Sequence, residues 1–255
     1  MSKWRLIGLT SHDAFMNMAV DEALVHQVSQ RKAPNTIRLY RWKPSAVSIG
    51  FFQSVEQEVN LEACKREGVD VVRRITGGGA VYHDYEGEVT YSLIAHQEDP
   101  IIPSDIKRSY EFICRAIVLG LERLGLKAEF RPVNDIVING RKVSGNAQTR
   151  RMKAVLQHGT VLVDVDVKKM FSFLKVSDEK IKDKVIKNVE ERVTSINREL
   201  GYKVSLKEVA DSLAKGFEQS LGLGLVEGEL DDEELSLAKR LRDEKYVTYE
   251  WNFKR

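Results

Sequence analysis

Residues 73–84 read RRITGGGAVYHD, so two arginines and three consecutive glycines precede a histidine–aspartate pair. Glycine weakens a strand interior, and three glycines between two β-rich runs need an explanation. Because they lack Cβ atoms, Gly77, Gly78 and Gly79 can adopt positive φ, and their N–H groups can approach a ligand closely. Taken alone, the triplet fits a flexible turn and a binding loop equally well. It is neither a P-loop, since GK[ST] is missing, nor a dinucleotide fingerprint, since a strand is expected after it.

The pattern around the triplet predicts an α+β fold with mixed or antiparallel sheets flanked by helices. Helical periodicity favours helices at 13–29, 62–68, 104–126 and 205–217. Ser104 and Asp105 are cap candidates for the third helix, and Ser205 with Glu208 three residues later forms a capping box for the fourth. The hairpin signal Asn139-Gly140 joins two of the expected strands. The β-rich runs lie at 36–42, 46–53, 69–76, 88–95, 134–140, 141–149 and 155–166.

The whole chain, 1–255, is expected to form one catalytic domain. Its core extends to about residue 175, and the pattern from Val167 onward predicts a helical continuation over about 176–255.

Composition excludes several classes of protein. The chain has 255 residues, 42% of them apolar, and its 40 basic residues nearly balance 38 acidic ones. A generic nucleic-acid or membrane binder would carry a larger basic excess, so neither partner is expected. The two cysteines show no metal-site spacing, and no apolar run is long enough for a signal or a membrane span. We therefore expect a cytoplasmic protein.

A second segment, NDIVINGRKVSGNAQTRR at 134–151, contains the other candidate charge. Lys142 lies between Gly140 and Gly145, a glycine context that a plain exposed strand does not need. A lysine aimed into a cleft suits a phosphate or a developing oxyanion, while the simpler alternative is a solvated surface charge. Arg74 at the end of the preceding strand could contact a phosphate or carboxylate in the same cleft.

No nucleophile is evident from the sequence. Cys114 is surrounded by apolar residues, Cys64 has no nearby histidine, and Ser144 has no base beside it in the sequence. His83 and His158 are each as consistent with a structural role as with a site. The chemistry is therefore expected to depend on binding and electrostatic stabilisation.

Together, RRITGGGAVYHD, NDIVINGRKVSGNAQTRR and LQHGTVLVDVD resemble the lipoate–protein ligase A family, which has the biotin/lipoate ligase fold. The resemblance runs from MNMAVDEAL near the N-terminus to EKYVTYEWNFKR at the end. It implies that Lys142 is catalytic and contacts both an α-phosphate and the lipoyl carbonyl. It also implies that Asn134 and Asp135 lie near the nucleotide, with Asp135 on its Mg²⁺. The binding residues predicted in this way are Arg74, Gly77, Gly78, Gly79, Ala80, Val81, Tyr82, His83, Asn134, Asp135, Lys142, Ser144 and Gly145.

The resemblance further implies an adenylate-forming ligase. Lipoate would react with ATP in the presence of Mg²⁺ to give lipoyl-AMP, and the lipoyl group would pass to a lysine of a lipoyl-domain acceptor. Such acceptors are the E2 subunits of 2-oxoacid dehydrogenases and the H protein of glycine cleavage. Because single-chain ligases continue into a further C-terminal domain, a separate small accessory subunit is also expected. The apolar tunnel for lipoate has Val71, Val81 and Val143 as candidates.

The same motifs also look like the octanoyltransferases of this fold. Those that share the SGNAQTRR block use a cysteine nucleophile upstream of the lysine strand, and residues 128–140, AEFRPVNDIVING, contain none. This missing thiol favours the ligase over transfer of octanoyl from acyl carrier protein. Biotin ligation and a binding module without catalysis are weaker alternatives.

Overall fold

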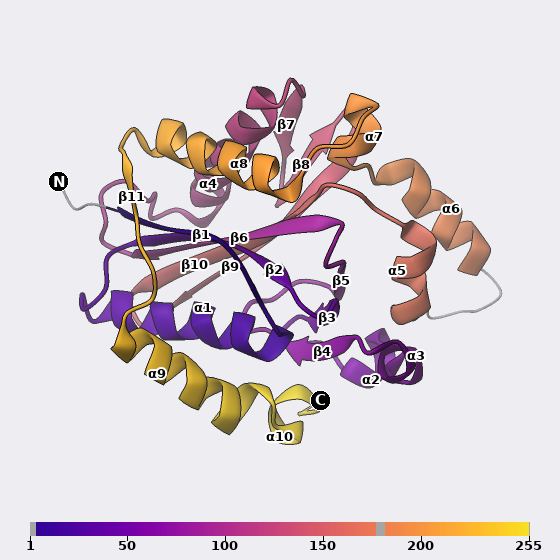
Figure 1. Cartoon of the computed structure of the whole chain (residues 1–255), viewed down its shortest axis with the longest axis horizontal. Helices are drawn as coiled ribbons and strands as arrows, with labels where there is room; N and C mark the ends of the chain where they lie inside the picture. Colours follow the sequence, from indigo (N-terminus) through magenta and orange to yellow (C-terminus); the bar gives the residue numbers. More distant parts are fainter. Residues whose placement is uncertain (1–3, 177–181, 255) are drawn as a thin grey trace.

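The computed structural model describes residues 4–176 and 182–254. It has the predicted α+β architecture, with helices on both sides of a large mixed sheet (Figure 1). The strands are β1 Trp4–His12, β2 Thr36–Trp42, β3 Ala46–Ile49, β4 Asp70–Arg73, β5 Val81–His83, β6 Glu88–His96, β7 Ala128–Arg131, β8 Asp135–Ile138, β9 Arg141–Arg151, β10 Ala154–Leu162 and β11 Leu225–Glu227. The helices are α1 Ala14–Ser29, α2 Val55–Glu58, α3 Leu61–Glu67, α4 Ile106–Arg123, α5 Val167–Phe173, α6 Lys182–Arg192, α7 Ile196–Leu200, α8 Leu206–Leu221, α9 Asp232–Leu241 and α10 Tyr249–Asn252, with a π-helical turn η2 at Arg242–Tyr246.

Eight strands form the large sheet in the order β11-β1-β2-β6-β10-β9-β8-β7. The pairs at the β11–β1–β2 edge are parallel and the remaining pairs are antiparallel. Three further strands form a small sheet in the order β4-β3-β5. The glycine triplet connects β4 to β5 and therefore lies at the end of the small sheet.

Two hydrophobic cores lie on opposite faces of the large sheet (Figure 1). Helices α4 and α8 cover one face, where Ile117 and Phe217 pack on sheet residues such as Tyr91. Helices α1 and α9 cover the other, where Leu24 and Trp42 are buried. The large sheet is thus buried on both faces, and the small sheet lies beside it.

Most of the expected local structure is present. Asp105 caps α4, and Ser205 with Glu208 forms the predicted capping box of α8. Asp13, which was not predicted as a cap, caps α1. Asn139 and Gly140 both have positive φ, as the hairpin signal required. One expectation was wrong, since the chain after Val167 is not helical throughout.

The exception to the helical continuation is β11, which pairs in parallel with β1 and forms one edge of the large sheet. Its three residues are too few for a period to be visible in the sequence. The division near residue 175 stays a prediction, and it adjoins residues 177–181, which lie outside the described residues. Beyond it, α8 packs on α4 and β11 joins the large sheet, so these later elements contact the core directly.

Helices α4 and α8 approach each other through glycine. A Cβ added at Gly216 would lie 2.2 Å from the carbonyl oxygen of Ala116 and 2.6 Å from the backbone nitrogen of Gly120. Gly216→Ala is therefore expected to lower the free energy of unfolding by about 1–2 kcal/mol, because an overpacking cost of up to about 3 kcal/mol outweighs the gain in helix propensity of about 1 kcal/mol. Urea denaturation measures the change. Gly224→Ala is the control, since its Cβ would meet nothing within 4 Å; equal stabilities of the two variants would contradict the prediction.

Candidate functional site

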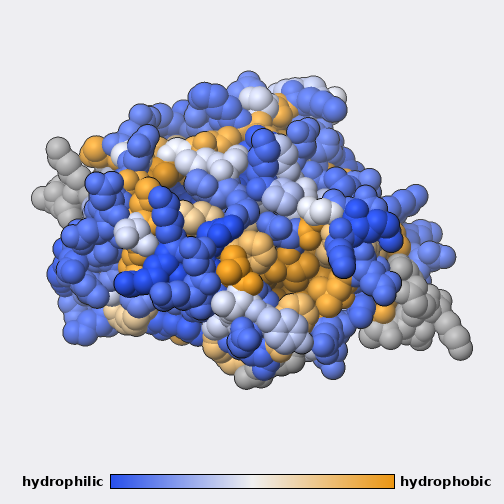
Figure 2. Space-filling model, turned by 60° about the horizontal axis from the view of Figure 1, so that its bottom comes forward, coloured by the Kyte–Doolittle hydropathy of each residue, from blue (hydrophilic) through white to orange (hydrophobic). Residues whose placement is uncertain are grey.

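A cavity of about 320 Å³ lies between the small sheet and strands β9 and β10 of the large sheet. This volume is within the range of small-molecule pockets, about 300–1,000 Å³. Figure 2 shows an apolar area in a hollow of the surface, on the side of the molecule where α5 lies. The apolar lining of the cavity includes Met18, Val81, Leu162, Val165, Met170 and Val193, and the polar lining includes Ser48, Arg74, His83, Glu88, Asn134, Lys142, Asn146 and His158.

The cavity brings together most of the binding residues predicted from the sequence. Those that line it are Arg74, Gly78, Gly79, Ala80, Val81, Tyr82, His83, Asn134, Lys142 and Gly145. Three others, Gly77, Asp135 and Ser144, do not line it. Of the valines expected to form a tunnel, only Val81 lines the cavity. Val143 is buried in the core under α4 and α8, and Val71 packs beside α3.

Arg74 holds the glycine triplet in place. Its guanidinium donates to the carbonyl oxygens of Gly77 at 2.9 Å and Gly79 at 2.7 Å. It also donates to Ser48 O at 3.2 Å, Ser48 Oγ at 3.1 Å and Thr76 Oγ1 at 3.1 Å. These five bonds occupy all five guanidinium donors. Burial lowers the pKa of Arg74 to about 10, so it stays charged at neutral pH. The triplet is consequently an ordered loop and not a flexible turn.

The loop also depends on a fourth glycine. A Cβ at Gly50 would lie 2.0 Å from the carbonyl oxygen of Gly78, so only glycine allows the two backbones to approach this closely. Gly78 itself has φ of +99°. The end of β3 and the triplet therefore form one packed unit.

Arg73, the other arginine of the pair, points away from this loop and anchors the C-terminal turn. Its guanidinium is fully buried and donates to the carbonyl oxygens of Trp251 and Asn252. It also donates to the carbonyl oxygens of Gly50 and Gln53. The two neighbouring arginines thus fix two different segments at the same end of the small sheet.

Lys142 reaches the cavity from β9. Its ammonium lies 2.7 Å from Asp135 Oδ1, and both side chains are partly exposed. The contact is an ion pair without hydrogen-bond geometry, since that oxygen has no hydrogen-bond partner among the described residues. Lys142 crosses over Gly145, where an added Cβ would lie 2.8 Å from Cε and 2.9 Å from Nζ. The absence of a side chain at position 145 therefore sets the position of the ammonium.

We expect Gly145→Ala to lower the enzymatic activity by about tenfold or more, because the new methyl group displaces the Lys142 ammonium. The fold should stay stable, because the end of the lysine side chain is flexible and can move away. The measurement compares kcat with the free energy of unfolding. Gly8→Ala is the control, since this strand glycine has open space around its Cβ position. Unchanged kcat in Gly145→Ala would show that the position of Lys142 does not matter.

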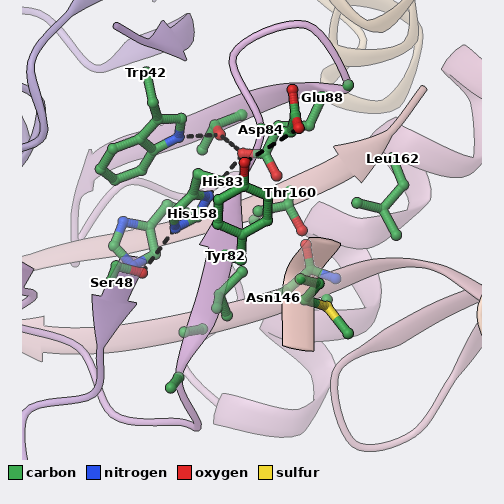
Figure 3. A pocket seen from close by; sticks show the side chains of 18 of the residues that line it. Trp42, Ser48, Tyr82, His83, Asp84, Glu88, Asn146, His158, Thr160 and Leu162 are labelled. Carbon is green, nitrogen blue, oxygen red and sulfur yellow. Dashed lines mark hydrogen bonds and ion pairs between the residues drawn. The ribbon is translucent and has the colours of Figure 1, made fainter. Parts of the chain in front are cut away.

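His83 forms part of a buried chain of hydrogen bonds (Figure 3). Its Nε2 lies 2.8 Å from Ser48 Oγ, and its Nδ1 lies 2.7 Å from Glu88 Oε1. Trp42 stacks on the imidazole at 4.0 Å between ring centroids and holds its plane. Asp84, next in sequence, points elsewhere and pairs with Lys169 at 2.6 Å. His83 therefore has a carboxylate partner, and that partner is Glu88.

A second chain of the same kind surrounds His158. Its Nε2 lies 2.7 Å from Thr76 Oγ1, and its Nδ1 lies 3.1 Å from Asp21 Oδ2. Asp21 also forms a buried ion pair with Arg38 at 3.0 Å. Burial lowers the pKa of His158, although Asp21 opposes this effect. The imidazole is thus held in its neutral form above that lowered pKa.

The free energy of unfolding is expected to decrease as the pH is lowered, because the pKa of His158 is lower in the folded protein than in the unfolded chain. Below the unfolded-state pKa of about 6.5, the unfolded chain binds a proton that the folded imidazole does not yet bind, so the free energy of unfolding decreases as pH falls. His158→Gln removes this titration and should reduce the slope between about pH 7 and pH 5.5. Urea denaturation at several pH values tests this, and an unchanged slope in the variant would contradict it.

Sequence reasoning did not single out Ser48, Glu88 and Asn146. Asn146 Nδ2 donates to Asn134 O at 2.8 Å, and Asn134 Nδ2 donates to Asn146 O at 2.6 Å. This reciprocal pair fixes the cavity edge beside Lys142. For Asn146 a signal was available, because it directly follows Gly145 in the SGNAQ run. Ser48 and Glu88 are ordinary residues of two strands, and only the pairing of β3 with β5 brings Ser48 to His83.

Neither cysteine lines the cavity. Burial raises the pKa of Cys64 to about 11 and that of Cys114 to about 12, so both are protonated thiols at neutral pH. Across residues 4–176 and 182–254, no group of three or more His, Cys, Asp or Glu side chains could hold a metal ion. Asp135, predicted as the Mg²⁺ ligand, instead pairs with Lys142. In the same part of the chain, no helix is long and apolar enough to cross a membrane.

The family model described as the lipoyl protein ligase A/B catalytic domain matches residues 13–218. The chain belongs to this family. Among its solved members is an archaeal bi-partite lipoate protein ligase from Thermoplasma acidophilum, which is 36% identical. The match covers 99% of this chain and 97% of that one, with a TM-score of 0.89. The predicted family and fold are thereby confirmed.

Curated members of the lipoyl protein ligase A/B family are also similar over the whole chain. Octanoyltransferase LipM of Brevibacillus brevis is 37% identical, with 100% of both chains covered. Octanoyltransferase LipM of Bacillus subtilis is 35% identical, with 99% of this chain and 98% of the relative covered. These relatives carry the activity that the sequence motifs had placed second.

The prediction of an ATP-dependent lipoate–protein ligase is therefore wrong, because these full-length relatives are octanoyltransferases. The predicted cofactors ATP and Mg²⁺ are wrong for the same reason. An octanoyl transfer moves an acyl group that is already activated, so no adenylate has to form. The prediction of an enzyme of this lipoylation family holds; its assignment to the adenylate-forming ligases does not.

Proposed function

We propose that this protein is an octanoyltransferase that moves an octanoyl group from a carrier-protein thioester to the ε-amine of a lysine on a lipoyl-domain protein. The observation that carries the proposal is the cavity, which joins an apolar wall to the Lys142 ammonium within one pocket. Met170, Leu162 and Val193 suit a hydrocarbon chain, whereas the lysine suits a reacting carbonyl. The octanoyltransferase names of the full-length relatives support the same reaction.

Acyl transfer develops negative charge on the carbonyl oxygen and releases a proton from the attacking group. In the proposed reaction Lys142 stabilises the oxyanion, because its ammonium is held in a fixed position at the cavity beside the reacting carbonyl. His83, oriented by Glu88, takes the proton. The glycine loop held by Arg74 forms the wall next to these groups. The lipoate substrate and the accessory subunit expected from the resemblance were tied to adenylation and are not part of this proposal.

The test supplies the purified chain with octanoyl carrier protein and a lipoyl domain in the absence of ATP. The expected result is a lipoyl domain whose mass has increased by one octanoyl group on its target lysine. A parallel reaction contains free octanoate or lipoate with ATP and Mg²⁺. Modification in that second reaction alone would overturn the proposed function.

A further inference from the structure

Among the described residues, Ser48 carries the only hydroxyl of the cavity lining that lies within hydrogen-bond distance of a histidine nitrogen, and that histidine has a carboxylate partner. It lies on β3, and its Oγ is 2.8 Å from His83 Nε2 (Figure 3). Glu88, on β6, lies 2.7 Å from the other ring nitrogen. Serine, histidine and a carboxylate in this order are the arrangement that makes a hydroxyl nucleophilic.

The carboxylate of Glu88 fixes the direction of the hydrogen bonds in this chain. An ionised Glu88 can only accept, so His83 Nδ1, the ring nitrogen that faces it, carries the proton and donates it. In the neutral imidazole Nε2 is then the acceptor, and the hydroxyl of Ser48 donates to it. Arg74, which has only donors, donates to the same Oγ at 3.1 Å. The tautomer with its proton on Nδ1 is the one in which an imidazole can remove the proton of a serine.

The surroundings favour the charges that such a reaction creates. Glu88 is 1% exposed and can stabilise the imidazolium that forms on His83. Arg74 lies beside Oγ and stabilises a developing alkoxide. Gly78 and Gly79 line the same cavity, and their backbone N–H groups have no acceptor among the described residues. With Lys142, they are the available donors for a carbonyl oxygen.

The second histidine chain does not offer the same chemistry. Thr76 Oγ1 also accepts from Arg74 and lies 2.7 Å from His158 Nε2, and His158 is paired with Asp21. However, Thr76 is fully buried and does not line the cavity. The two chains share one guanidinium, but only the hydroxyl of Ser48 reaches the space where an acyl group could bind.

We propose that Ser48 is the acyl-accepting nucleophile, an inference that rests on the octanoyltransferase function proposed above. Ser48 Oγ attacks the carbonyl carbon of the octanoyl thioester while its proton passes to His83 Nε2. The carbon–sulfur bond then breaks, and the departing thiolate takes that proton and leaves as the carrier thiol. The product of this half-reaction is an octanoyl ester on Ser48.

The second half-reaction returns the serine. The neutral ε-amine of the acceptor lysine attacks the ester carbonyl, and the bond to Oγ breaks. His83 transfers the proton from the amine to Oγ, so that serine and an amide result. Thioester and amine have become thiol and amide, and no oxidant, metal or nucleotide is consumed. The missing cysteine at residues 128–140 is then no obstacle to covalent transfer.

The experiment mixes the protein with octanoyl carrier protein, without an acceptor, and measures intact mass after acid quenching. We expect the mass of one octanoyl group on the wild type, located on Ser48 by peptide mapping. Ser48→Ala should show no adduct and lose at least about 10³-fold in kcat. Ser48→Cys should form a thioester that neutral hydroxylamine cleaves, whereas the wild-type serine ester resists this treatment.

Thr76→Val is the matched control, because its hydroxyl has the same kinds of partner but no access to the cavity; it should still form the adduct. If Ser48→Ala octanoylates the acceptor at about a tenth of the wild-type rate or faster, Ser48 is not the nucleophile. The octanoyltransferase function would still stand in that case. A wild type that forms the ester on Ser48 but never modifies a lipoyl domain would support the nucleophile and refute the proposed acceptor.

Discussion

Lys142→Ala is expected to lower kcat for octanoyl transfer by about 10²–10³-fold, equivalent to roughly 2.7–4 kcal/mol of transition-state stabilisation. The lysine is the only side-chain ammonium among the lining residues, and its partner Asp135 lies outside that lining. Its charge acts mainly on the oxyanion, which exists only after attack, so KM should change much less than kcat. Steady-state kinetics with an octanoyl thioester and a lipoyl domain measure both constants.

Two further variants control for this result. Lys127→Ala removes an exposed lysine that does not line the cavity, so it should leave kcat unchanged. Asp135→Asn keeps the lysine but removes the opposing carboxylate, which tests whether the ion pair positions the ammonium. If Lys142→Ala and Lys127→Ala have the same kcat, Lys142 takes no part in the reaction.

Asp21→Ala is expected to lower the free energy of unfolding by about 3–5 kcal/mol, because it leaves the charge of Arg38 buried without its partner. Both side chains are about 1% exposed, and Asp21 also accepts from Ser92 at 2.8 Å. Although burial alone would raise the pKa of Asp21, its hydrogen bond with His158 and the charge of Arg38 lower it. The ionised form therefore stabilises the fold above the unfolded pKa of about 3.9, and this stability is lost as pH falls through the folded value.

The double variant Asp21→Ala/Arg38→Met separates two effects of Asp21→Ala: the loss of the ion pair and the cost of leaving the Arg38 guanidinium buried without a counter-charge. Removing both ions should recover part of the stability, since the largest cost of the single variant is an unpaired buried guanidinium. Urea denaturation of the two single variants and the double variant completes the cycle. A double variant that is less stable than Asp21→Ala would contradict this explanation.

Local signals predicted much of this fold. The caps at Asp105 and Ser205 and the Asn139-Gly140 turn were correctly placed, because each depends on a few neighbouring residues. Strand β11 was missed, since its place beside β1 is decided by tertiary packing. The sequence also indicated that the triplet and Lys142 belong to one site. It did not reveal that Gly50 must approach Gly78, because this contact joins two loops.

The activity was harder to predict than the site. The missing cysteine at residues 128–140 counts against acyl transfer only if the nucleophile has to lie in that one segment. A nucleophile and its base need not be neighbours in sequence. Ser48 and His83 are separated by 35 residues and meet only because β3 pairs with β5. Sequence spacing therefore gave no sign of the arrangement around Ser48.

The bonds from Arg73 to the C-terminal turn give that turn the role of an intramolecular ligand. Trp251 and Asn252 bind the guanidinium that also holds Gly50, and Gly50 packs on the triplet. Covalent attachment gives this ligand a high effective concentration, on the order of millimolar for a flexible tether, and so keeps its site occupied. Binding of the C-terminal turn to Arg73 therefore stabilises the ordered glycine loop, although Asn252 lies 179 residues after Arg73 in the chain.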